Sequence, residues 1–149
     1  MSRLRGVDPF PKLWARRTSM RLADGLRCEV LALPDLVRAQ KTQRDKDWPM
    51  IRRLVEAHYF QARERPTAIQ VRFWLRELRT PALILEVVRR YPRLSHRAVL
   101  ERPLLRYAAR GRTDALERAL AKEEAAERQR DRRYWLPLRK ELEQLRHAR

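Results

Sequence analysis

Prolines and helix-capping residues divide the chain from residue 34 onward into short segments, and this spacing constrains its fold more than any other feature. Proline lacks a backbone N–H, so it is tolerated in the first turn of a helix and disfavoured further along it. The pair Thr80-Pro81 therefore marks a helix start, and Pro92 marks a helix end. These intervals predict short helices over residues 34–40, 48–63, 68–79, 81–91, 96–101 and 104–110.

Apolar residues at helical spacing indicate which of these helices is most buried. The segment 68–79 is apolar on most of its faces, which predicts the most buried helix of the protein. Asp47 precedes the helix 48–63 and is predicted to be its N-cap. His58 lies on the apolar face of that helix, so we expect a buried or boundary histidine rather than a metal ligand.

A β-hairpin is predicted before the helices. Its arms are Ala15–Ala23 and Leu26–Leu33, and Asp24-Gly25 between them suits a type I′ turn. A two-stranded hairpin is marginally stable by itself, so we expect the helices 34–40 and 48–63 to cover it. We also expect an exposed strand edge. Residues 1–13 are predicted to be irregular.

A long helix is predicted from Thr113 or Asp114 toward the C-terminus, after a left-handed cap at Gly111. Its middle, residues 122–133, is almost entirely polar, so we expect it to stand in solvent. Pro137 predicts a kink or a fresh start. The apolar residues that recur at 3-4-3 spacing predict a seam that packs back on the body or, as the alternative, pairs with a protein partner. They are Trp135, Leu138, Leu142 and Leu145.

These patterns together predict an α+β fold that is mostly helical. An N-terminal β-hairpin packs under a helical bundle, and a long helix ends the chain. We divide the chain into residues 1–64 with the hairpin and two helices, residues 65–112 with the bundle, and residues 113–149 with the mixed-charge helix.

The net charge of +17 constrains the partners of the protein rather than its fold. Residues 1–113 carry 26 basic and 11 acidic side chains, so the excess charge belongs to the body. Such a surface attracts nucleic acid, although an arginine-rich coding bias would give the same composition. Aromatic side chains that are candidates to stack on bases are Trp14, Trp48 and Tyr107, whereas Trp74 is predicted to be core.

The remaining composition excludes several classes of protein. The single cysteine, Cys28, cannot form an internal disulfide and indicates a reducing compartment. We find no secretory signal and no apolar run long enough to span a membrane, so we predict a cytoplasmic protein without membrane contact. The histidines and the cysteine have no metal-ligand spacing, and the isolated glycines form no phosphate-binding loop.

Several short motifs follow the hairpin in a fixed order. A strand reading CEVL ends at Leu31, a turn reading LPDL follows it, and then come Lys41 and the sequence RDKD at residues 44–47. In this order the motifs resemble the segment after the metal-binding strands in bacterial nucleotidyltransferase-like proteins of the polymerase-beta type. The closest group includes toxins of toxin–antitoxin pairs. The resemblance covers residues 10–60, and it implies that the hairpin is a remnant of a nucleotidyltransferase sheet.

The resemblance also implies roles for individual residues. Glu29 stands at the position of a metal-binding carboxylate, and Lys41 and Arg44 stand at nucleotide-binding positions. Asp35 and Asp47 belong to the structural part of the motif. Mg²⁺ is the cofactor that the family's chemistry requires, because the ion bridges the triphosphate and stabilises charge on the attacking and leaving oxygens.

Other family motifs do not occur in this sequence. No glycine precedes a serine, and the only Asp-x-Asp pair, Asp45 and Asp47, falls after the hairpin rather than on a strand before it. We therefore expect a truncated or degenerate nucleotidyltransferase-like protein without a complete metal site or complete activity of its own. The alternatives are a basic nucleic-acid-binding protein and a toxin–antitoxin-type interaction protein. Whether Met1 is the true start decides whether a missing half exists.

Overall fold

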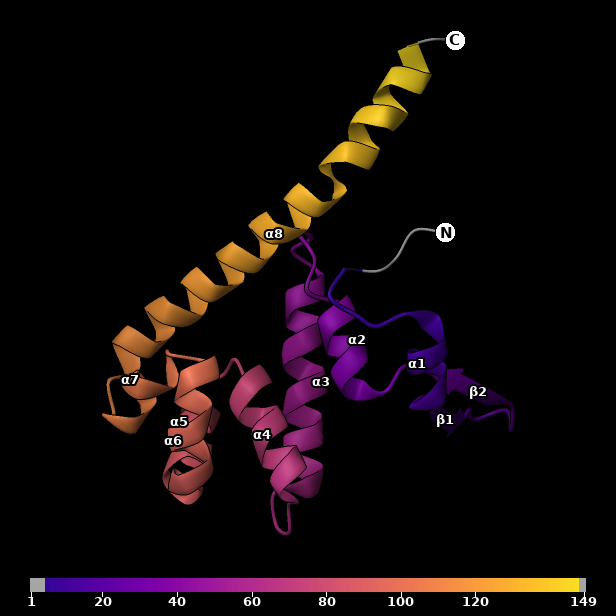
Figure 1. Ribbon diagram of the computed structural model, residues 1–149. Helices are drawn as coiled ribbons and strands as arrows, with labels where there is room; N and C mark the ends of the chain where they lie inside the picture. Colours follow the sequence, from indigo (N-terminus) through magenta and orange to yellow (C-terminus); the bar gives the residue numbers. More distant parts are fainter. Residues whose placement is uncertain (1–4, 148–149) are drawn as a thin grey trace.

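The computed structural model describes residues 5–147, in which a small hairpin precedes a set of mostly short helices (Figure 1). The fold is α+β and mostly helical, as the sequence predicts, and the strands β1 and β2 pair antiparallel with Thr18 opposite Val30. The elements are α1 Phe10–Ala15, β1 Thr18–Arg21, β2 Arg27–Val30, α2 Leu33–Ala39, α3 Asp47–Ala62, α4 Ala68–Glu77, α5 Pro81–Arg90, α6 Pro92–Glu101, α7 Leu105–Ala109 and α8 Thr113–His147.

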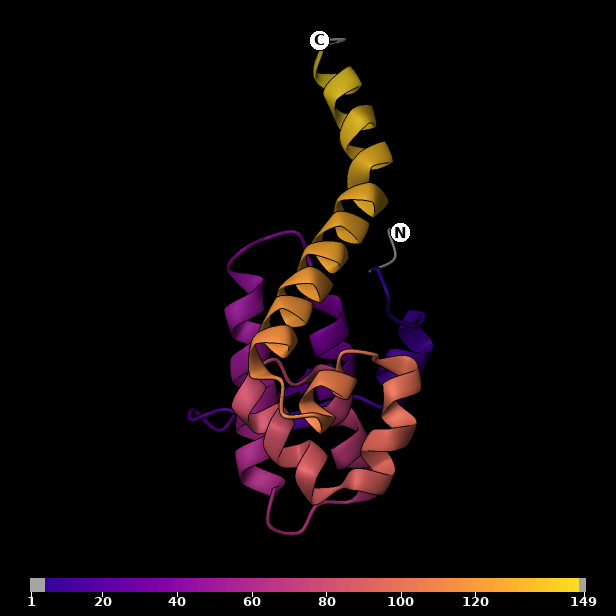
Figure 2. The same cartoon turned by 90° about the vertical axis from the view of Figure 1, so that its left-hand side faces the viewer.

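The helices α2 to α7 form the body, and the first half of α8 crosses it before the helix extends beyond it (Figures 1 and 2). Trp74 of α4 is fully buried at the centre of the core, as the apolar pattern of this helix predicts. Side chains from α2, α3, α5, α7 and α8 belong to the same apolar cluster. Within residues 5–147, no helix is long and apolar enough to cross a membrane.

Local capping chemistry sets several helix boundaries as predicted. Thr67 and Gln70 form a reciprocal capping box at the start of α4, with each side chain bonded to the other residue's backbone N–H. Pro81 occupies the first turn of α5. Gly111 has a φ of 66° and ends α7 in the left-handed conformation that glycine adopts without strain.

Other boundaries differ from the predictions. Residues 10–15 form α1 instead of an irregular lead-in, and α6 begins at Pro92, four residues earlier than expected. Pro92 both ends α5 and starts α6, because its fixed φ suits a first helical turn. Asp47 is the first residue of α3 rather than its N-cap, and its carboxylate bonds to the preceding loop.

The sequence predicts a type I′ turn in the hairpin, but the structure has a different turn. A type I′ turn needs positive φ at both central residues, but of Asp24 and Gly25 only the glycine has a positive φ, of 84°. The Gly25 N–H donates to Leu22, and the Leu22 N–H donates to Leu26. These bonds define a three-residue loop that ends in a left-handed glycine, so the arms are shorter than predicted.

The hairpin also lies apart from the helices that were expected to cover it. All residues of β1 are exposed, and β2 alternates between exposed and half-buried residues. Figure 1 shows the hairpin beside α1, projecting from the body. The expected cover by α2 and α3 is therefore wrong, while the expected exposed strand edge is present.

Two predictions for the last helix, α8, differ from the structure. Its middle, predicted to stand in solvent, contacts the body through the buried Asp131 and the half-buried Glu123. Of the seam expected to pack back on the body, Trp135 is half-buried beside the loop between α2 and α3, whereas the leucines are exposed: Leu138 is 40% exposed and Leu145 is 59% exposed. The helix continues through Pro137. A protein partner for the seam stays a prediction.

One hydrogen bond in the body depends on pH. The Trp74 Nε1–H donates to His58 Nδ1 at 2.9 Å, so this nitrogen must carry no proton. Burial lowers the pKa of His58 below its ordinary value of 6.5. His58 is half-buried and lies against the ring of Phe73, which agrees with its prediction as a boundary residue.

We therefore expect the free energy of unfolding to be highest above pH 6.5 and to fall as the pH drops below it. The unfolded histidine takes up a proton first, so acid favours the unfolded chain. Urea unfolding between about pH 8 and about pH 5.5 measures the slope of this free energy against pH. His58→Gln should remove it, and His96→Gln, at an exposed position, should leave it unchanged. An equal slope in the His58→Gln variant would contradict the prediction.

Candidate functional site

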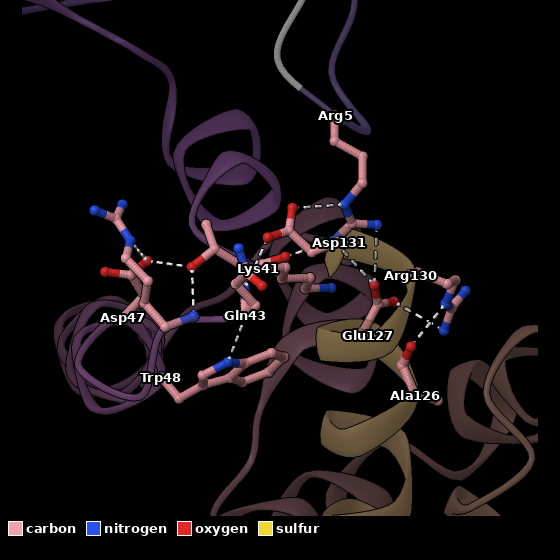
Figure 3. Close-up of polar contacts among 11 residues, drawn as sticks. Arg5, Lys41, Gln43, Asp47, Trp48, Ala126, Glu127, Arg130 and Asp131 are labelled. Atoms are coloured by element: carbon pink, nitrogen blue, oxygen red, sulfur yellow. Dashed lines mark hydrogen bonds and ion pairs between the residues drawn. The ribbon is translucent and has the colours of Figure 1, made fainter. Parts of the chain in front are cut away.

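The loop between α2 and α3 lines a cleft of about 540 Å³ that faces α8 and the N-terminal segment. Two residues that the resemblance implies bind nucleotide, Lys41 and Arg44, both line it. Figure 3 shows Lys41 and its neighbours in the loop facing the α8 residues Glu127 and Asp131. Further basic side chains, Arg5 and Arg139, lie on the walls of the same cleft, together with Trp135.

Lys41 has a carboxylate partner inside the protein. Its Nζ lies 2.6 Å from Oε2 of Glu77, a residue of α4 that is 3% exposed. A buried carboxylate needs a compensating charge, because transfer from water into the protein disfavours its ionised form. The lysine side chain is itself 16% exposed. Lys41 therefore neutralises Glu77, and this contact limits what it can offer to a phosphate.

Arg44 and Asp47 stabilise the conformation of the loop between α2 and α3. The Arg44 Nε–H donates to the Asp47 carboxylate at 3.0 Å, and the Thr42 hydroxyl donates to the same carboxylate. The Trp48 Nε1–H donates to the carbonyl of Thr42 at 3.0 Å. Trp48 is buried, which removes it from the candidates for base stacking. The Arg44 side chain is 61% exposed, so it can still meet a ligand in the cleft.

Asp131 fastens α8 to the loop and to the N-terminal segment. Its carboxylate accepts the backbone N–H of Gln43 at 2.9 Å and the Arg5 Nε–H at 3.1 Å (Figure 3). Arg5 also donates to the carbonyl of Lys41 at 2.5 Å and forms an ion pair with Glu127. The far wall of the cleft is therefore built on internal ion pairs, and its shape depends on them.

Glu29, the implied metal carboxylate, is not brought to the cleft. It lies on β2, where it accepts a hydrogen bond from the Ser19 hydroxyl at 2.7 Å and pairs with Arg17 at 2.9 Å. The hydrogen bond from Ser19 and the nearby arginines lower the pKa of Glu29. Asp35 is buried in a bidentate pair with Arg16, at 2.5 and 2.7 Å.

The described residues do not fit a magnesium site. Across residues 5–147, no group of three or more histidine, cysteine, aspartate or glutamate side chains could hold a metal ion. Glu29 stands among arginines, which repel a cation, and in the only Asp-x-Asp pair Asp45 lies in the loop and Asp47 begins α3, where Arg44 donates to its carboxylate. We therefore derive no catalytic step through Mg²⁺ for these residues.

A buried ionic network beside the cleft was missed by the sequence analysis. Arg102, directly after α6, donates to Glu123 of α8 through Nε at 3.0 Å and Nη2 at 3.1 Å, and Arg79 donates to the same carboxylate at 3.2 Å. Arg79 also lies over the ring of Trp48, 4.5 Å from its centroid. Burial by itself would raise the pKa of Glu123, but the charge and hydrogen bonds of Arg102 outweigh it, so the pKa is lowered.

Comparison with known proteins identifies no relative of this chain. No protein family model, no curated protein and no solved structure matches it.

Proposed function

We propose that this chain is a truncated nucleotidyltransferase-like protein whose sheet and active site are completed by a further polypeptide segment. That segment would supply the Gly-Ser turn and the Asp-x-Asp strand that this sequence lacks. The chain itself would contribute the hairpin and the loop with Lys41 and Arg44. In this proposal it has no complete nucleotidyl transfer activity alone, and Mg²⁺ joins only in the completed unit.

The uncovered hairpin carries this proposal. A hairpin of two strands is marginally stable in water unless more strands or a helix cover it. The large apolar side chains around it are nevertheless exposed, and the Phe10 and Trp14 rings, which stack at 5.7 Å, are 62% and 48% exposed. The exposed set is Phe10, Trp14, Met20, Leu22 and Leu26. An added strand would pair with the open edge and bury these side chains.

The register of the hairpin identifies which amides an added strand would meet. The Leu22 N–H donates to the Leu26 carbonyl, so these two residues form a hydrogen-bonded pair. Met20, two residues before Leu22 on the same strand side, lies opposite Cys28. In an antiparallel pair, hydrogen-bonded positions alternate with positions whose backbone groups point outward. Arg21 therefore directs its N–H to the open edge of β1, where proline would block pairing and alanine would not.

We expect the chain isolated from its source cells to be heavier than 18.0 kDa, or to be bound to a segment carrying Gly-Ser and Asp-x-Asp. The complex should bind a fluorescent ATP analogue in Mg²⁺. Arg21→Pro should abolish assembly and nucleotide binding, and Arg21→Ala should preserve both. Arg27→Pro with Arg27→Ala tests the outer edge of β2 in the same way. An 18.0 kDa chain that elutes alone and binds no nucleotide would refute the proposal.

Nucleic-acid binding is the second candidate function, and unpaired cations favour it. Many arginines on the helical body are exposed and make no hydrogen bond or ion pair with another described residue. Such side chains add repulsion to the folded protein without an internal partner, and they attract polyanions. They include Arg53, Arg65, Arg72, Arg89, Arg93 and Arg97.

A further inference from the structure

A second cleft, of about 470 Å³, lies between α4 and α6 on the helical body. Its residues come from α4, α6 and the position after α6: Arg72, Leu75, Arg76, Leu94, Arg97, Ala98, Glu101 and Arg102. None of them belongs to the cleft beside α8 or to the hairpin. We call this cleft the α4–α6 groove.

The helical spacing explains why the arginines meet in the groove. Arg72 and Arg76 are four residues apart on α4, so they lie on one face about one turn, or 5.4 Å, from each other. Arg97 faces them from α6, which packs against α4. Between them Leu75, Leu94 and Ala98 give the groove an apolar floor.

Two of the four arginines in the groove have no internal partner. Arg72 and Arg97 are exposed and have no hydrogen-bond or ion-pair partner among residues 5–147, whereas Arg76 forms an ion pair with Glu77 at 3.4 Å. Glu101 is the acidic residue of the lining. Arg72 lies one helical turn from the like charge of Arg76, and such a pair destabilises a helix, so Arg72 gives the folded protein no internal benefit to stability.

Arg102 fixes the back of the groove. It is buried, and its Nη1 donates to the carbonyls of Leu75 and Leu78 at 2.9 Å each. These bonds tie the end of α6 to the end of α4 and hold the two helices at a set separation. The groove is therefore a feature of the packed body, and its exposed cations stand at the rim.

We infer that the α4–α6 groove binds the phosphate groups of a nucleic-acid backbone, an assignment that rests on nucleic acid being a partner of this protein. Guanidinium groups present paired N–H donors that match the oxygens of a phosphate. No aromatic side chain lines the groove, so bases have no stacking platform there. Contacts restricted to the backbone bind without strong preference for sequence.

The test uses the full chain and fluorescein-labelled 20-nucleotide RNA and DNA, single-stranded and duplex, in anisotropy titrations. Arg72→Gln/Arg97→Gln should weaken binding about tenfold or more. It should also reduce the slope of log K against log salt by roughly two phosphate contacts, or about 1.4–1.8. Arg118→Gln/Arg133→Gln is the matched control, because it removes the same charge from exposed, unpaired arginines of α8 that do not line the groove. We expect this control to change the dissociation constant by less than about threefold and to leave the salt slope unchanged.

Several outcomes would overturn the assignment, and they separate it from the underlying function. Equal weakening by both double variants would show diffuse attraction by net charge, so the groove would be wrong and nucleic-acid binding right. If the wild-type protein binds no nucleic acid, both the groove assignment and nucleic-acid binding are wrong. Inorganic phosphate or AMP that displaces the RNA at equal phosphate concentration would point to a small phosphate ligand. Polyglutamate that competes as well as RNA at equal charge would point to an acidic protein.

Discussion

Replacing Arg102 with alanine is expected to lower the free energy of unfolding by about 3–5 kcal/mol, the range for breaking a buried ion pair by removing one partner. The substitution leaves Glu123 with only the longer contact from Arg79 and leaves the carbonyls of Leu75 and Leu78 without their donor. Unpaired buried acceptors add a desolvation penalty of their own. Urea unfolding followed by circular dichroism measures the loss.

Two matched variants separate the hydrogen-bond network from the charge. Arg102→Lys keeps the positive charge, but one ammonium cannot replace a guanidinium that serves two carbonyls and a carboxylate, so we expect an intermediate loss. Arg97→Ala, on the helix that Arg102 follows but exposed and unpaired, should change stability by less than about 0.5 kcal/mol. An Arg102→Lys protein as stable as the wild type would contradict the network.

The helices of the body could be predicted because their boundaries depend on local chemistry. Thr67 caps α4 through its own side chain, and Pro81 starts α5 through its fixed φ, with no contribution from distant residues. The burial of Trp74 followed from the apolar faces of one helix. These features require only neighbours in sequence, so the sequence alone indicates them.

The contact between α8 and the body could not be predicted in the same way. Acidic residues at every fourth position, Glu123, Glu127 and Asp131, continue the buried stripe of Leu116 and Leu120 along one face. The sequence pattern marks this face as solvated, because carboxylates are ordinarily exposed. These carboxylates can be buried because arginines far away in the sequence pair with them. Only the tertiary structure brings those arginines next to α8. The four-residue spacing of the acids was the one available signal.

The candidate site was predicted in part. Motif order directed attention to Lys41 and Arg44, which do line one cleft, but it could not reveal that a helix much later in the chain supplies the opposite wall. Nor could it reveal that Glu29 points into a cluster of hairpin arginines rather than toward these residues. The position of a strand relative to a helix depends on what covers the sheet, and local sequence carries no record of that.

Replacing Lys41 with alanine should therefore lower the free energy of unfolding by about 2–3 kcal/mol, below the full range for a buried pair because the lysine is partly exposed. The substitution leaves the carboxylate of Glu77 buried with only the contact from Arg76. Urea unfolding of Lys41→Ala, Glu77→Gln and the double variant Lys41→Ala/Glu77→Gln measures the coupling between the two side chains. The double variant should recover most of the loss, because it leaves no unpaired charge.

Lys46 provides the control that separates stability from ligand binding. It lies in the same loop, is exposed, and makes no side-chain contact with another described residue, so Lys46→Ala should leave stability unchanged. If Lys41 served only a phosphate ligand, Lys41→Ala would likewise leave stability unchanged and would weaken only the binding of nucleotide in Mg²⁺. A loss of stability that Glu77→Gln repairs instead assigns the lysine to the fold. Weak nucleotide binding by Lys41→Ala then says nothing about catalysis unless the repaired double variant is also tested, because a destabilised protein binds every ligand less well.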